Sequence, residues 1–206
     1  MERSYLWKYL QILARFLTTN LFDLKVYGIE NVPQTGGVLL AANHQSYLDP
    51  VLVAVRLQRP VSFMAKSELF ENPFFGWFIR SLHAYPVRQG EGDIGAIRQA
   101  IQRLNGGYAL NVYPEGHRTE DGSIRPLEKG IALILRKVDV PVVPVAIHGS
   151  FQAWNKGSKL FHPHSIHVMY GKPLYLKDLP AKKVLESLHG AMLSLFNDLK
   201  QKHPLD

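Results

Sequence analysis

Short apolar runs alternate with amphipathic stretches along this chain, and this alternation restricts the folds that it can adopt. The apolar runs have the length and the aliphatic content of buried strands, and they occupy residues 38–42, 61–65, 108–113, 142–147 and 165–170. Between and after them, apolar residues recur at helical spacing within residues 93–105, 131–137 and 180–199. Strands that alternate with helices predict an α/β fold with a largely parallel central sheet flanked by helices.

Composition narrows the class of protein further. A chain of 206 residues with 46% hydrophobic and 20% charged residues fits one globular domain and excludes intrinsic disorder. The absence of cysteine excludes disulfides, cysteine-ligated zinc and a cysteine nucleophile. The 24 Lys and Arg against 17 Asp and Glu give a net charge of +7, which favours an anionic partner: nucleic acid, lipid head groups or a phosphorylated substrate.

The N-terminal stretch, residues 5–24, predicts one or two amphipathic helices with leucines and aromatic residues on one face. Two alternatives follow: the apolar face packs on the protein's own core, or the helix lies in the head-group plane of a membrane. No run of about 20 apolar residues is present, so the sequence predicts no transmembrane helix. Basic residues interrupt the region that a signal peptide would need, and we expect none.

The first group of residues with chemical potential lies at 43–49, where a predicted strand gives way to a predicted helix. Ligand sites of open α/β sheets gather at the carboxyl ends of strands. His44 and Asp49 can meet across such a turn, where the carboxylate would orient the imidazole and stabilise its cationic form. The alternative is that Asp49 caps the helix, with Pro50 at its first position, and that His44 is an ordinary loop histidine. The two roles of Asp49 could also coexist, because a carboxylate has several acceptor sites.

The second group follows the predicted strand 108–113. Here Pro114, Glu115 and Gly116 form a turn through which the backbone can approach an anion, and Arg118 offers a planar fork that suits phosphate. The alternative is a polar turn with a solvated arginine. Arg88, which ends another apolar stretch, is a weaker signal of the same kind.

Taken in order, these segments resemble the glycerolipid acyltransferase family, in particular its bacterial 1-acylglycerol-3-phosphate acyltransferases. The family's N-H-x-x-x-x-D block corresponds to residues 43–49, its block ending in arginine to Arg88, its F-P-E-G-T-R-S block to residues 113–119 and its V-P-V-x-P-V block to residues 140–145. Residues 65–69 and 129–130 match two shorter segments. The resemblance covers residues 38–147, with three departures: Tyr113 for phenylalanine, His117 for threonine, and His83-Ala84 where glycine is frequent.

The resemblance implies transfer of a fatty acyl group from acyl-CoA or acyl carrier protein to the hydroxyl of a lysophospholipid. His44 would be the general base, and Asp49 would support its imidazolium form. The resemblance further implies that Arg88 and Arg118 bind the acceptor's phosphate, that Glu115 and Gly116 shape that loop and that Lys66 contributes to anion binding. No metal and no cofactor are expected.

A lysophospholipid substrate also implies a membrane. Residues 1–28 would then be an amphipathic helical membrane-binding motif, and residues 29–206 the acyltransferase domain. With the aromatic residues of 70–78, the motif would bind an anionic membrane surface, as a peripheral or monotopic protein on the cytoplasmic face of the cell membrane.

Three rival functions were weighed against this one. The acceptor could be another lysolipid, such as a lyso-aminolipid, a question that His117 raises directly. A non-catalytic membrane-binding protein is opposed by the intact His44 and Asp49. Nucleic-acid binding is not expected, because the aromatic residues lie in apolar runs rather than between basic residues.

Overall fold

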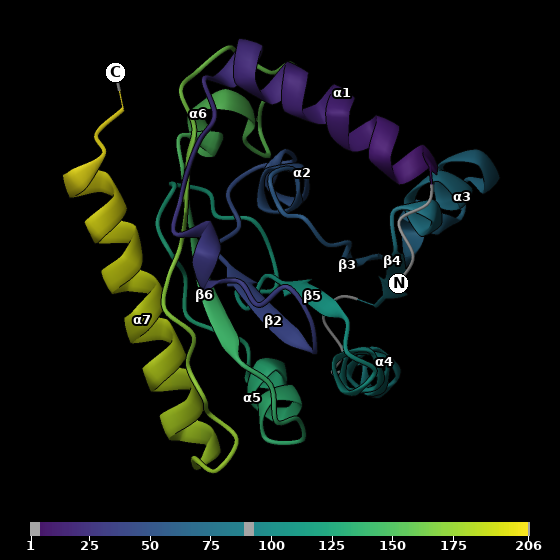
Figure 1. Ribbon diagram of the computed structural model, residues 1–206, viewed down its shortest axis with the longest axis vertical. Helices are drawn as coiled ribbons and strands as arrows, with labels where there is room; N and C mark the ends of the chain where they lie inside the picture. The colour runs from purple at the N-terminus through teal and green to yellow at the C-terminus, as the bar shows by residue number, and fades with distance from the viewer. Residues whose placement is uncertain (1–4, 89–92, 206) are drawn as a thin grey trace.

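The computed structural model describes residues 5–88 and 93–205, which form one seven-stranded sheet with helices on both faces (Figure 1). The strands are β1 (Lys25–Tyr27), β2 (Val38–Ala42), β3 (Val61–Lys66), β4 (Ala84–Val87), β5 (Ala109–Val112), β6 (Val142–His148) and β7 (His167–Tyr170), in the spatial order β1-β7-β6-β2-β5-β3-β4. Neighbouring strands are parallel except β6 and β7, which are antiparallel. This confirms the predicted α/β fold with a largely parallel central sheet.

Seven α-helices and two short 3-10 helices accompany the strands in the described part of the chain. The α-helices are α1 (Tyr5–Phe22), α2 (Asp49–Ala54), α3 (Pro73–Ser81), α4 (Ile94–Asn105), α5 (Lys129–Leu135), α6 (Ser150–Trp154) and α7 (Ala181–Lys202), and the 3-10 helices are η1 (Ile29–Asn31) and η2 (Ser67–Phe70).

The two faces of the sheet carry separate hydrophobic cores, because successive side chains of a strand point to opposite sides. On β2, Leu40 packs into a cluster that includes residues of α1, α2 and α6. Its neighbour Leu39 packs into the opposite cluster, with residues of α4, α5 and α7. Figure 1 shows α4, α5 and α7 on one side of the sheet and α1 and α2 on the other. Strand β2 is buried along its whole length because both of its faces are covered.

Helix α1 divides its residues between the protein and the surface. Trp7, Thr18 and Phe22 are buried, and Gln11 Nε2 donates a hydrogen bond of 2.7 Å to the carbonyl oxygen of Leu57. The opposite face is apolar and exposed, and it carries Tyr9, Ile12, Leu13, Phe16 and Leu17. The two alternatives predicted for this helix therefore do not exclude one another. One face packs on the domain, and the opposite face is an exposed apolar surface.

A second exposed apolar surface lies on α3, within the aromatic segment that the sequence singled out. Asn72 Oδ1 caps this helix by accepting a hydrogen bond of 3.0 Å from the Phe75 amide. Phe74 is 85% exposed and Trp77 65% exposed, although both are large apolar side chains. In Figure 1, α3 lies at the N-terminal end of α1.

The structure also contains elements that the sequence did not predict. Among them are strand β1, which pairs with β7, strand β4, which pairs with β3, and helix α6. The sequence did not predict the reversal of β7 either. None of the helices in residues 5–88 and 93–205 combines the length and the hydropathy that crossing a bilayer requires.

Candidate active site

The carboxyl ends of five parallel strands meet at one edge of the sheet, and the predicted site residues come from four of them. His44 follows β2, the loop with Glu115 follows β5, Lys66 ends β3 and Arg88 follows β4. Because β2 and β5 are neighbours, the sheet brings the first two groups together and places the other two progressively farther away.

His44 and Asp49 form a hydrogen-bonded pair at the end of β2. The imidazole Nδ1 lies 2.8 Å from Asp49 Oδ2, and the aspartate is fully buried, whereas the histidine side chain is 19% exposed. A buried carboxylate accepts hydrogen bonds, so Nδ1 carries the proton and Nε2 presents its lone pair outward. This is the arrangement of a histidine prepared to accept a proton from a bound group.

The position of Asp49 corrects one prediction. The alternative in which Asp49 caps the helix is wrong, because α2 begins at Asp49 itself and no side chain caps it. The carboxylate instead turns back to the preceding loop, where Oδ2 accepts hydrogen bonds of 2.7 Å from the amides of Gln45 and Ser46. Those two bonds hold the carboxylate oxygen at the point where His44 meets it.

The loop that carries His44 is fixed from both sides. The Asn43 side chain pairs with the backbone of Ile147 on β6, donating from Nδ2 at 3.0 Å and accepting at Oδ1 at 2.7 Å. On the other side, the Thr119 amide donates to the carbonyl oxygen of His44 at 2.9 Å. The backbone of the histidine therefore has little freedom to move.

Glu115 connects the two loops of the site. Its Oε1 accepts a hydrogen bond of 2.8 Å from the His44 amide, and its Oε2 accepts another of 2.8 Å from the Arg125 amide. The side chain is only 1% exposed. Burial raises the pKa of Glu115 from 4.5 to about 7, although both amide hydrogen bonds lower it. With both oxygens bound to backbone, the geometry favours a positioning role over direct contact with a substrate.

Gly116 forms the turn after Glu115. Its φ of +75° lies in the left-handed region, and a Cβ at this position would come within 3.0 Å of Glu128 Cγ. Glycine is the residue that meets both conditions without strain.

Tyr113 is a member of the site whose contact the sequence did not predict. Its ring stacks on the imidazole of His44, with ring centroids 3.9 Å apart and planes 15° apart. Burial raises the pKa of the Tyr113 phenol well above its usual value. The tyrosine thus supports one face of the imidazole and limits its rotation.

Arg118 is stacked rather than solvated, contrary to the alternative reading of its turn. Its guanidinium carbon lies 3.6 Å from the centre of the Tyr47 ring, a contact that the sequence did not predict. Its Nη1 is buried and has no hydrogen-bond partner among the described residues. A held guanidinium with a free donor is suited to bind an anion beside the two loops.

Lys66 and Arg88 lie farther along the same edge, and both are exposed. Lys66 pairs in register with Val87, the residue before Arg88. Strand β4 is three positions from β2, which is about 14 Å at the usual spacing of strands. Within the described chain, no contact joins either side chain to His44, so the structure does not bring these two residues into the His44 cluster.

In residues 5–88 and 93–205, no group of three or more His, Asp or Glu side chains is arranged to hold a metal ion. The chemistry that this cluster offers is proton transfer at His44 and anion binding at Arg118.

The chain is similar in sequence to known acyltransferases. Residues 23–148 match the acyltransferase family. The chain is 31% identical over 183 residues to the 1-acyl-sn-glycerol-3-phosphate acyltransferase of Bacillus subtilis, covering 87% of this chain and 89% of that protein. It is 27% identical to a chloroplastic 1-acyl-sn-glycerol-3-phosphate acyltransferase of Brassica napus, but spans only 52% of that longer protein.

A solved structure is similar as well. The crystal structure of the 1-acyl-sn-glycerophosphate (LPA) acyltransferase PlsC of Thermotoga maritima matches with a TM-score of 0.83 and 30% identity, over 94% of this chain and 79% of that one. A family match over more than half of the chain, together with a full-length relative above 30% identity, establishes the relationship. The chain belongs to the acyltransferase family, as its ordered motifs predicted.

Proposed function

We propose that this protein transfers a fatty acyl group from a thioester, acyl-CoA or acyl carrier protein, to the free hydroxyl of 1-acylglycerol-3-phosphate, giving phosphatidic acid for phospholipid biosynthesis. The observation that carries the proposal is the pair of His44 Nδ1 and buried Asp49 Oδ2 at 2.8 Å, beside an arginine with an unpartnered donor. The names of the similar proteins support the choice of acceptor.

The reaction needs one proton to move twice. The acceptor hydroxyl is a weak nucleophile until a base takes its proton, and His44 Nε2 is the atom that the hydrogen bond to Asp49 leaves available. As the oxygen bonds to the thioester carbonyl carbon, the proton passes to Nε2 and the carboxylate of Asp49 stabilises the imidazolium. The carbon–sulfur bond then breaks, and the departing thiolate takes the proton back from His44.

The anionic part of the acceptor is assigned to the arginine side of the site. Arg118 is on the loop next to His44, so we propose that it holds the phosphate of the acceptor, with its guanidinium braced on Tyr47. Arg88 and Lys66 lie farther along the same edge and would bind phosphate groups at a greater distance from His44. Glu115 and Gly116 shape the loop and leave the chemistry to His44.

We also propose that the protein works on the cytoplasmic face of the cell membrane, as a peripheral or monotopic protein. The exposed apolar faces of α1 and α3 support this, because contiguous exposed aromatic and aliphatic side chains on basic proteins suit an anionic bilayer surface. Residues 1–28 would form the membrane-binding motif and residues 29–206 the acyltransferase domain; residues 1–4, 89–92 and 206 lie outside the described chain, and β1, within residues 1–28, is itself a strand of the sheet.

The test is an acyl-transfer assay with the purified full chain in detergent micelles. Lysophosphatidic acid and a lyso-aminolipid would be offered separately, each with acyl-CoA and with acyl carrier protein thioester, and products would be identified by mass spectrometry. The proposal predicts phosphatidic acid as the main product. Transfer to the lyso-aminolipid alone would contradict the acceptor, and no transfer to either would contradict the activity.

A further inference from the structure

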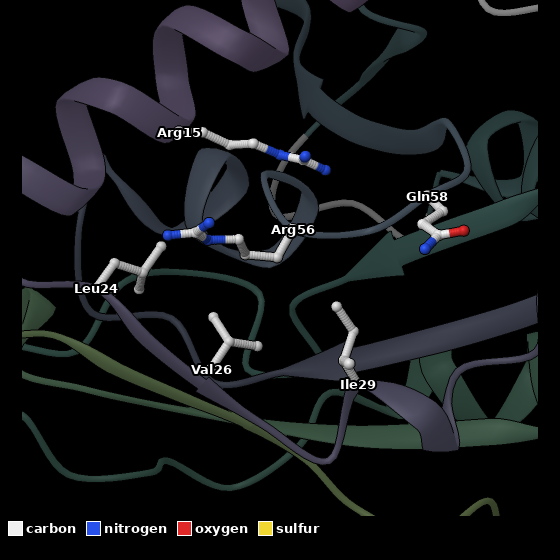
Figure 2. A pocket seen from close by; sticks show the side chains of 6 residues that line it. All are labelled: Arg15, Leu24, Val26, Ile29, Arg56 and Gln58. Carbon is white, nitrogen blue, oxygen red and sulfur yellow. The ribbon is translucent and has the colours of Figure 1, made fainter.

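A surface pocket of about 410 Å³ lies beneath α1, away from the carboxyl edge of the sheet that carries His44. Its walls come from α1, β1, η1 and the segment that follows α2, and Figure 2 shows the residues that line it: Arg15, Leu24, Val26, Ile29, Arg56 and Gln58. Two arginines and three aliphatic residues therefore line one pocket. None of these residues belongs to the candidate active site.

The two arginines are held in place without a carboxylate partner. Arg15 Nε donates to the carbonyl oxygen of Val55 at 2.8 Å, and Arg56 Nη2 donates to Thr19 Oγ1 at 2.7 Å. Within residues 5–88 and 93–205, neither guanidinium forms an ion pair with Asp or Glu, and each keeps donors that no hydrogen bond uses. Two fixed positive charges that share one pocket repel each other, and an anion bound between them would remove that repulsion.

The pocket lies at the border of the exposed apolar face of α1. Successive residues of a helix are 100° apart around its axis, so Arg15 lies about 60° from Ile12. Thr19, which accepts the hydrogen bond from Arg56, lies about 20° from Ile12. Ile12 is itself 64% exposed. A helix that rests on a bilayer with Ile12 and Phe16 immersed would place both guanidinium groups at the level of the lipid phosphates.

We infer that this pocket binds the phosphate of an anionic phospholipid, separately from the acceptor site. The inference rests on the proposed membrane association. Arg15 and Arg56 would bind the phosphate oxygens, and Leu24, Val26 and Ile29 would contact the glycerol and the first methylene groups of the chains. A lipid fits this mixed lining better than free phosphate, which makes no use of the aliphatic wall. The site would orient α1 on anionic membranes.

The test replaces a pocket residue that makes none of the structural contacts. Gln58 lines the pocket and is exposed, and its side chain has no hydrogen-bond partner in the described chain. Gln58→Glu places a carboxylate in the lining of the same pocket, so the hydrogen bonds that dock α1 remain while the pocket gains a negative charge. Gln201→Glu, at the exposed end of α7 on the opposite face of the sheet, is the matched control with the same change of net charge.

Binding of the full chain would be measured by flotation with phosphatidylcholine vesicles, with and without about 30 mol % phosphatidylglycerol. Phosphatidylglycerol is used because it is neither the proposed substrate nor the proposed product. The inference predicts that Gln58→Glu weakens binding to the anionic vesicles about fivefold or more, whereas Gln201→Glu changes it less than about twofold. Binding to pure phosphatidylcholine should be the same for all three proteins.

Three results would overturn the inference. These are equal weakening by the two variants, equal affinity of the wild type for both kinds of vesicle, and displacement of the protein by about 1 mM inorganic phosphate, which would assign the pocket to the free ion. Acyl transfer in detergent micelles separates this failure from failure of the proposed function. Gln58→Glu should retain wild-type turnover there, and a wild type inactive in micelles would contradict the enzyme rather than the pocket.

Discussion

Glu115 gives this site an unusual dependence of stability on pH. The carboxyl is 1% exposed, and burial raises its pKa from 4.5 to about 7. As the pH rises from about 4.5 to about 7, the unfolded chain releases this proton first, so the folded state loses stability across that window. Because each pKa unit corresponds to about 1.4 kcal/mol, the full loss attributable to Glu115 is about 3 kcal/mol.

The perturbation that isolates this effect is Glu115→Gln, which keeps the shape of the side chain and cannot ionise. Other groups also titrate: burial and the nearby Lys200 lower the pKa of His148 to about 4, which makes stability rise with pH below neutrality. His148 is present in both proteins, so its contribution cancels in the difference between wild type and variant. That difference is the quantity to measure.

The assay is urea unfolding followed by far-ultraviolet circular dichroism at about pH 5 and about pH 8. We expect the free energy of unfolding of the wild type to fall by about 2–3 kcal/mol relative to Glu115→Gln between these two pH values. Glu186→Gln, at an exposed position on α7, is the control and should show no such difference. If the free energies of unfolding of wild type and Glu115→Gln changed equally between the two pH values, the raised pKa of Glu115 would be contradicted.

Three further substitutions test individual contacts of the site. Asp49→Asn keeps the size of the buried side chain but removes the charge that stabilises the imidazolium, so kcat should fall about 10²–10⁴-fold; a loss below about tenfold, measured by phosphatidic acid formation, would count against that role. Arg118→Lys keeps the charge without the fork or the stack on Tyr47, so KM for lysophosphatidic acid should rise about tenfold while KM for the thioester stays unchanged; equal effects on both would move Arg118 away from the acceptor. Tyr113→Phe removes a buried hydroxyl that lies beside the Asn111 side chain but keeps the stack on His44, so kcat should stay within about twofold; a large loss of rate would give the hydroxyl a chemical role.

The fold was predictable where a residue pattern repeats over several positions. Strands β2 and β6 were recognised because a strand covered on both faces is apolar at almost every position. Helix α4 was recognised because its buried face carries apolar residues at helical spacing, at Ile97, Ile101 and Leu104. Strand β1 was missed because it has only three residues and depends on pairing with β7. The direction of β7 depends on the path of the preceding loop, which no local pattern records.

The site was predictable at the level of motifs and not at the level of contacts. His44 and Asp49 were paired correctly because five residues across a turn leave few ways for them to meet. The helix cap at Asp49 was wrong because capping preference describes an average helix start, whereas this carboxylate finds stronger partners in the loop before it. The stacks of Tyr113 on His44 and of Arg118 on Tyr47 join the loops that follow β5 and β2, so they follow only from the assembled sheet.

In the proposed reaction His44 takes the proton of the acceptor hydroxyl, and the rate of acyl transfer by His44→Ala measures that role. The comparison is made at saturating lysophosphatidic acid and thioester in detergent micelles, with melting curves of both proteins. We expect a loss in kcat of about 10²–10⁴-fold with little change in melting temperature, because Asp49 keeps its two backbone hydrogen bonds. Turnover by a folded His44→Ala protein within about tenfold of the wild-type rate would contradict it.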